Sequence, residues 1–179
     1  ARNLLKQEVS YYNYIMTTLM NKIIQAQLCE HVLTDIDLNH LINGTDAMRY
    51  GLVNKAVKKN EIIIIKRGLY TLASQYRQTK LSQYFLANRI APHSYISLEA
   101  ALSYHNWISE RVTWVMSITA QGRTRQFSTP FGEFIFYRLP INEYQFLTGV
   151  NRLEAFKHQP FFLASPLRAI TDHVYLNKV

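Results

Sequence analysis

Basic side chains gather between Met48 and Arg67, where Glu61 is the only acidic residue. The six basic residues are Arg49, Lys55, Lys58, Lys59, Lys66 and Arg67. With Glu61 they give this stretch a net charge of +5. Ammonium and guanidinium groups collected in this way bind phosphate oxygens, although a run of charge also occurs as a solvated face. The cluster predicts a phosphate-contacting surface if the local secondary structure places these residues together.

Other residue types with chemical potential do not form a recognisable site. Six histidines fall in no close metal-ligand spacing: His31, His40, His93, His105, His158 and His173. No Walker loop, GxGxxG or GxSxG motif is present, so phosphate-cradling and nucleophile-bearing turns are missing. A nuclease would need clustered carboxylates near a lysine, and Glu154 with Lys157 lacks a second acidic residue beside it. We expect a protein that is not an enzyme and that holds neither a metal nor a cofactor.

Asp172 and His173 are neighbours on a predicted helix near the end of the chain. Successive helical side chains point about 100° apart, so these two cannot hydrogen-bond as a catalytic dyad. We expect them to be a pair on the helix surface.

Composition narrows the class of protein. The chain has 179 residues, 48% of them hydrophobic, and a formal net charge of +8. The single Cys29 excludes an internal disulfide, which favours a reducing cytoplasm. The longest aliphatic run, residues 62–65, is far shorter than the roughly 20 residues of a membrane-spanning helix. We therefore expect a soluble cytoplasmic protein with no membrane partner, and the start without Met suggests a trimmed or processed chain.

Three helices are predicted ahead of and within the basic stretch. Apolar residues recur at three- and four-residue steps over residues 14–29 and again over residues 35–42, after Thr34 as an N-cap candidate. Thr45 then caps a third helix that has Asp46 in its first turn, where a negative charge suits the helix dipole. Asn60 follows as a left-handed C-cap residue.

The third helix has two contrasting faces. Leu52, Val53, Ala56 and Val57 form one stripe, while the opposite side carries Ala47, Gly51, Asn54, Lys55, Lys58 and Lys59. Residues 61–65 form a β-branched strand, residues 66–68 a tight turn and residues 69–72 the returning strand. Helix, turn, helix and basic-tipped hairpin together predict a winged helix-turn-helix, within a domain spanning residues 1–78.

The third helix and the hairpin are the candidate DNA-contacting elements. We expect the helix to enter a major groove and the hairpin tip to touch an adjacent phosphate or the minor groove. The candidate residues are Thr45, Arg49, Tyr50, Asn54, Lys55, Lys58, Lys59, Lys66 and Arg67. Arg49 and Tyr50 fall near the packed stripe, so either packing or DNA contact fits them. A protein-interaction module whose basic helix meets an acidic partner without specific DNA binding is the alternative function.

Four segments resemble a known family. Residues 53–70 (VNKAVKKNEIIIIKRGLY) resemble the recognition helix and wing of AbiEi-type antitoxins, the transcription-regulator half of type IV toxin-antitoxin systems. Residues 94–105 (SYISLEAALSYH) resemble that family's Tyr-Ile-Ser-Leu-Glu block. Residues 127–132 (FSTPFG) resemble its Thr-Pro-x-Gly hairpin, and residues 164–175 (ASPLRAITDHVY) its C-terminal block. The matches run in family order from about residue 34 to residue 175.

The resemblance implies a DNA-binding repressor that autoregulates its own operon by binding inverted repeats in the promoter. It also implies a functional partner, a nucleotidyltransferase toxin, with which no stable complex is expected. Two positions depart from the family pattern: Leu167 stands where Glu is usual, followed by Arg168 in place of Lys, and Asn60 stands where Gly is usual. Losing the Glu removes any role that depends on its charge.

Residues 79–179 are predicted to form a second domain of the α+β class. The resemblance implies that this is an AbiEi-like antitoxin domain. We predict a helix from residue 81 that stops before Pro92, and another over residues 98–105 with Ser97 as N-cap. Strands are predicted at 112–119 and, broken by a turn at 130–132, at 126–139. Ser165 and Pro166 open a closing helix. The fold class is α+β.

Two further features of this domain remain open from the sequence. Arg123 and Arg125 flank Thr124 after Gly122, and they form either a second basic contact with DNA or protein or an ordinary polar hairpin. Aromatic residues alternate within or beside the strands, which is more typical of a core than of a base-stacking platform. They are Trp107, Trp114, Phe134, Phe136 and Tyr137.

Overall fold

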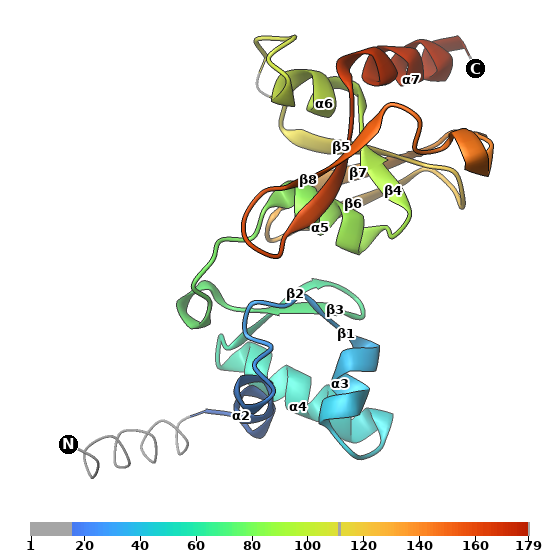
Figure 1. The fold of residues 1–179 in the computed structure, drawn as a ribbon. Helices are drawn as coiled ribbons and strands as arrows, with labels where there is room; N and C mark the ends of the chain where they lie inside the picture. The colour runs from blue at the N-terminus through green and yellow to red at the C-terminus, as the bar shows by residue number, and fades with distance from the viewer. Residues whose placement is uncertain (1–15, 111, 179) are drawn as a thin grey trace. The chain divides into compact units, whose positions relative to one another are not determined.

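The protein is a mixed α+β chain. The computed structural model describes residues 16–110 and 112–178, and these form six α-helices and two β-sheets (Figure 1). The chain divides into two compact units, residues 1–78 and residues 79–179, which we call unit 1 and unit 2. Each unit has its own sheet and its own helices.

The described residues of unit 1 form three α-helices, a short 3-10 helix and a three-stranded sheet. Its elements are α2 (Thr18–Gln25), β1 (Leu33–Thr34), α3 (Asp35–Leu41), α4 (Asp46–Lys58), β2 (Ile62–Lys66), β3 (Leu69–Leu72) and the short 3-10 helix η1 (Ser74–Tyr76). The sheet has the order β1-β3-β2 and is antiparallel throughout. Helix α2 is shorter than the predicted span 14–29, because Gln27 adopts a left-handed φ of 57° after it. Residues 14 and 15 of that span lie outside the described residues.

Side-chain caps fix where the helices of unit 1 begin and end. Thr34 and Asp37 form a reciprocal capping box at the start of α3, and Thr45 accepts a hydrogen bond from the backbone N–H of Met48 at the start of α4. Asn60 has a φ of 54°, the left-handed conformation predicted for a residue that ends a helix. The predicted starts of α3 and α4 are therefore confirmed, as is the end of α4.

The core of unit 1 lies between the helices and the sheet. Val53 and Ala56 of α4 are buried, and Leu52 and Val57 beside them are partly buried, so the apolar stripe of this helix is confirmed. The other buried core residues come from α2, from α3 and its C-cap, and from the three strands: Leu19, Met20, Ile23, Leu33, Leu38, Ile42, Ile62, Tyr70 and Leu72. With its apolar stripe packed into this core, α4 has one face fixed inward.

A buried carboxylate joins α2 to the start of the hairpin. Glu61 is 2% exposed, and its Oε1 accepts a hydrogen bond of 3.0 Å from the backbone N–H of Thr17, whose hydroxyl donates to Oε2. Thr17 is itself the N-cap of α2, so the carboxylate sits at the positive end of that helix.

We expect Glu61→Ala to lower the free energy of unfolding of unit 1 by about 2 to 3 kcal/mol, because it leaves buried donors of Thr17 unpaired. Glu61→Gln keeps one acceptor oxygen and is expected to lose less. Hydrogen exchange of residues 16–25 and 62–72 in the full chain measures the effect. Unaltered protection in the Ala variant would contradict a stabilising role for this carboxylate.

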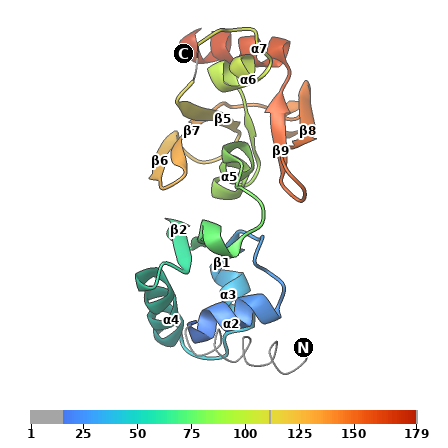
Figure 2. The same ribbon diagram turned by 90° about the vertical axis from the view of Figure 1, so that its left-hand side faces the viewer.

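Unit 2 is a six-stranded sheet with helices on both faces. Its strands are β4 (Ser94–Ile96), β5 (Trp114–Thr119), β6 (Arg125–Thr129), β7 (Gly132–Arg138), β8 (Val150–Glu154) and β9 (Pro160–Ala164), in the order β6-β7-β5-β4-β9-β8. Helix α5 (Gln83–Ile90) covers one face, while α6 (Leu98–Tyr104) and α7 (Pro166–Lys178) cover the other (Figure 2). The short 3-10 helix η2 (Glu143–Gln145) precedes β8.

The sheet of unit 2 mixes parallel and antiparallel pairs. Strands β5 and β7 are parallel, as are β4 and β9, whereas β6–β7, β4–β5 and β8–β9 are antiparallel. Because β7 lies between β5 and β6, the connection through Gly122 crosses the end of another strand. The alternative of an ordinary polar hairpin around Arg123 and Arg125 is therefore wrong.

The helices of unit 2 lie at the predicted positions, but α5 starts at Gln83 instead of residue 81 and α6 ends at Tyr104 instead of residue 105. Helix α5 ends before Pro92, and α7 starts at Pro166 with the Ser165 hydroxyl accepting from the N–H of Arg168. Ser97 precedes α6 but makes no capping hydrogen bond. Its hydroxyl donates instead to a carboxylate on α7, so the prediction that Ser97 caps α6 is wrong in its chemistry.

Candidate functional site

The face of α4 opposite the core is exposed and basic. Its polar residues Asn54, Lys55 and Lys58, with Lys59 directly after the helix, are all exposed. Ala47 and Gly51 lie among them, and a Cβ placed on Gly51 would meet nothing within 4 Å. This surface is made of long cationic side chains around a strip of small residues, where another backbone can approach closely.

Three further candidates, Thr45, Arg49 and Tyr50, lie at or near the start of α4. Thr45 is exposed as the N-cap, and Tyr50 is 42% exposed. Arg49 is only 7% exposed and pairs with Asp46, its Nη2 lying 2.5 Å from Oδ1. Its Nε is buried without a hydrogen-bond partner among the described residues. Arg49 thus lies on the packed side of α4, separate from the exposed basic face.

The β2–β3 hairpin presents one exposed cation at its turn. Arg67 is exposed, whereas Lys66 is half-buried at the end of β2, next to an irregularity in the register after Ile64. Gly68 has a φ of 76°, and a Cβ there would lie 2.9 Å from Oδ2 of Asp35. The close approach of α3 to the turn therefore requires glycine.

Asp35 also anchors the returning strand. The Tyr70 hydroxyl donates a 3.0 Å hydrogen bond to Oδ1 of Asp35. Burial, together with this hydrogen bond and the negative charge of Asp35, raises the pKa of Tyr70 to about 12. The contact ties α3 to the hairpin, so the turn that carries Arg67 is held by side chains rather than by the two strands alone.

Unit 2 contains a hydrogen-bonded cluster between α7 and the sheet. The Oδ2 of Asp172 accepts from the Tyr95 hydroxyl at 3.0 Å and from the Ser97 hydroxyl at 2.7 Å, and Oδ1 accepts from Nε of Arg168 at 2.9 Å. Asp172 is 3% exposed, so the prediction of a surface pair with His173 is wrong for this residue. The helix packs its Asp172 side onto the sheet, while the exposed His173 lies 3.5 Å from Glu99.

Arg168 completes the cluster. Its Nη2 donates to the Tyr95 hydroxyl at 2.7 Å, and its Nη1 donates to the backbone carbonyls of Gln145 and Thr148. Burial alone would lower the pKa of Arg168, but Tyr95 and Asp172 together raise it. Burial and the charge of Asp172 raise the pKa of Tyr95 well above its ordinary value. The guanidinium therefore acts as a clamp between α7, β4 and residues 145–148.

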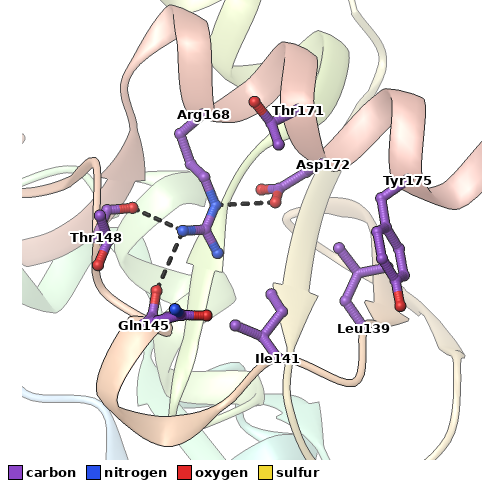
Figure 3. A pocket seen from close by; sticks show the side chains of 8 residues that line it. All are labelled: Leu139, Ile141, Gln145, Thr148, Arg168, Thr171, Asp172 and Tyr175. Atoms are coloured by element: carbon purple, nitrogen blue, oxygen red, sulfur yellow. Dashed lines mark hydrogen bonds and ion pairs between the residues drawn. The ribbon is translucent and has the colours of Figure 1, made fainter.

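A cavity of about 370 Å³ opens beside this clamp (Figure 3). Its lining residues are Leu139, Ile141, Gln145, Thr148, Arg168, Thr171, Asp172 and Tyr175. The charged groups that line it are already paired with one another or with carbonyls, so they hold the wall in place and offer a ligand little free hydrogen-bonding capacity. Leu167, where the resembled family has Glu, is 72% exposed.

The remaining candidates are spread over unit 2. Arg123 and Arg125 are exposed at the start of β6. Phe134 and Phe136 are buried in the sheet as predicted, whereas Trp107 is 57% exposed, so the expectation of a core role is wrong for that residue. Within residues 16–110 and 112–178, no three His, Cys, Asp or Glu side chains gather as a metal site would require.

Comparison with known proteins adds no assignment. No protein-family model matches the chain, and a search of the curated proteins finds no significant match. Of the helices in the described part of the chain, none combines the length and the apolar character that a bilayer crossing requires.

Proposed function

We propose that this protein is a sequence-specific transcriptional repressor that binds double-stranded DNA through unit 1. The observation that carries the proposal is the two-sided character of α4, whose buried Val53 and Ala56 fix Asn54, Lys55 and Lys58 outward. In this proposal unit 1 is a winged helix-turn-helix. Helices α3 and α4 are the helix-turn-helix, α4 is the recognition helix and the β2–β3 hairpin is the wing.

The dimensions of α4 suit a major groove. Its 13 residues give a length of about 20 Å, and a B-DNA major groove about 12 Å wide admits one α-helix. Asn54 is the side chain on the exposed face that can pair with an adenine edge, while Lys55 and Lys58 supply charge to phosphates. In this proposal Arg67, which is exposed at the hairpin turn, contacts a neighbouring phosphate.

The resemblance to AbiEi-type antitoxins extends the proposal to an operon. In that setting the protein represses its own promoter at inverted repeats, and unit 2 carries the activity that counters a nucleotidyltransferase toxin. The cytoplasm is the compartment that this role requires. A reading frame for such a toxin beside the gene would support the antitoxin role, and without one the DNA-binding proposal stands on α4 alone.

Two single substitutions on α4 test whether it reads sequence. Asn54→Ala is expected to cost about 1 to 3 kcal/mol on the operator with little change on random DNA, because only base pairing is lost. Lys58→Ala is expected to weaken both DNAs and to lower the salt slope by about one, because a phosphate contact is lost. Fluorescence anisotropy across a salt series measures both.

The two variants serve as controls for each other, since both residues are exposed on the same helix. Equal losses on operator and random DNA for Asn54→Ala would remove base reading from this residue. Full affinity in both variants would show that α4 is not the recognition helix. Binding to an acidic protein that weakens with salt, with no affinity for either DNA, would favour the protein-interaction alternative.

A further inference from the structure

Three exposed arginines, Arg123, Arg125 and Arg138, lie at one end of the β6–β7 hairpin in unit 2. Arg125 pairs with Phe136, the last pair of the antiparallel register; Arg138 lies two residues after Phe136 at the end of β7, and Arg123 lies two residues before the start of β6. The backbone N–H of Arg138 donates a 3.3 Å hydrogen bond to the Thr124 hydroxyl, which joins the end of β7 to the segment before β6. Residues opposite each other in an antiparallel pair project from the same face. Arg125 and Arg138 therefore project from the same face, and Arg123 directly precedes this end of β6; we call the three residues the arginine corner.

The ion pairs of the described residues do not include the arginine corner. Glu133, the acidic residue of the same hairpin, lies at the other end of β7, where it accepts from the Ser128 hydroxyl. Like charges on neighbouring strands repel, so this arrangement costs stability unless an anion binds there.

The local backbone keeps the arginine corner open. Gly122 has a φ of 83°, and a Cβ there would lie 3.1 Å from Nη2 of Arg125. A larger residue at this position would crowd that guanidinium. On the same face, the rings of Phe127 and Phe136 contact each other edge to face, with their centroids 5.8 Å apart. The strands that carry the arginines are thus held by apolar packing, with the cationic groups beyond it.

We propose that the arginine corner is a second phosphate-binding surface, and that its partner is the backbone of duplex DNA. Residues two apart on a strand are separated by about 6.5 Å, so Arg123 and Arg125 are spaced for successive groups of a polyanion. Guanidinium groups also bind phosphate oxygens bidentately. The corner adds affinity and salt dependence without reading sequence. The choice of DNA as the polyanion rests on the proposed function of unit 1.

The test removes the three charges from the full chain. The variant is Arg123→Gln/Arg125→Gln/Arg138→Gln, and its matched control is Lys80→Gln/Arg152→Gln/Lys157→Gln, which removes the same charge from exposed positions elsewhere in unit 2. Binding to a random duplex of about 40 base pairs is measured by anisotropy across a salt series, with thermal melting as the check on folding. We expect the arginine variant to lower the salt slope by about three and the affinity about tenfold, and the control to change neither.

A salt slope equal to that of the control would overturn the arginine corner as a DNA contact. Loss of binding to a single-stranded RNA of equal length, with duplex affinity retained, would overturn it as well. A third variant, Lys55→Gln/Lys58→Gln, separates this proposal from the function of unit 1. If only the Lys55→Gln/Lys58→Gln variant loses duplex binding, the proposed function of unit 1 is supported and the arginine corner does not contact DNA. If only the arginine variant loses duplex binding, α4 is not the DNA-binding helix and the arginine corner is the DNA-binding surface.

Discussion

If α4 binds DNA as proposed, reversing the charges of Lys55 and Lys58 to Glu is expected to lower the affinity for duplex DNA by at least about a hundredfold at 100 mM salt, because two phosphate contacts would be replaced by two repulsions. Both side chains are exposed on the face of α4 that points away from the core, so folding should be unaffected. Anisotropy with operator and random duplexes measures the loss. Circular dichroism and thermal melting verify the fold.

The control for this reversal is Lys80→Glu/Lys157→Glu. It changes the net charge by the same amount at two exposed positions of unit 2. If long-range attraction alone drove association, the two variants would lose affinity equally. A loss more than about tenfold larger in the α4 variant assigns the contact to α4, and equal losses would remove α4 from the interface.

Asp172→Ala is expected to destabilise unit 2 by about 3 to 5 kcal/mol, since it leaves a largely buried guanidinium without its carboxylate partner. It also removes the acceptor of the Tyr95 and Ser97 hydroxyls. Urea unfolding of the full chain, followed by a probe in unit 2 such as Trp114, measures the change. His173→Ala is the matched control: the next residue is exposed, and its loss should stay within about 0.5 kcal/mol.

A second variant separates the charge from the shape of this cluster. Replacing both partners, Arg168→Met/Asp172→Leu, is expected to recover part of the stability lost in Asp172→Ala, because no unpaired charge is left buried. An Asp172→Ala protein as stable as the His173→Ala control would show that the cluster does not hold α7 on the sheet.

Local signals made unit 1 predictable. The caps at Thr34 and Thr45, the left-handed Asn60 and the β-branched run of β2 each act within a few residues, and the structure confirms them. The exposed basic face of α4 followed from helical periodicity in the same way. Arg49 was ambiguous because its angle lies near the packed stripe, and only the tertiary packing places it inside.

Non-local pairing explains what the sequence could not predict in unit 2. Strand β4 has three residues, which are too few to show an alternation of apolar and polar side chains. Strands β8 and β9 are defined by their pairing with each other and by the pairing of β9 with β4. The burial of Asp172 was missed because an aspartate is usually exposed. A signal was present: Ala169 and Leu176 fall three and four residues away from it, on the same helical face.

The parallel pairing of β4 with β9 has a consequence for how the chain folds as it is synthesised. Ile96 of β4 pairs with Leu163 of β9, so this edge of β4 stays unpaired until residue 163 has been synthesised. Helix α7, which supplies Asp172, is synthesised after that. Until then β4 exposes an open edge, the feature that promotes aggregation of nascent sheets. The last strand of unit 1 ends at Leu72, so all three strands of its sheet are synthesised before those of unit 2. Incomplete chains that end before residue 160 therefore contain every strand of unit 1, but in unit 2 they lack β9, the partner of β4. We expect cellular quality control to recognise such chains by their unpaired strand edge.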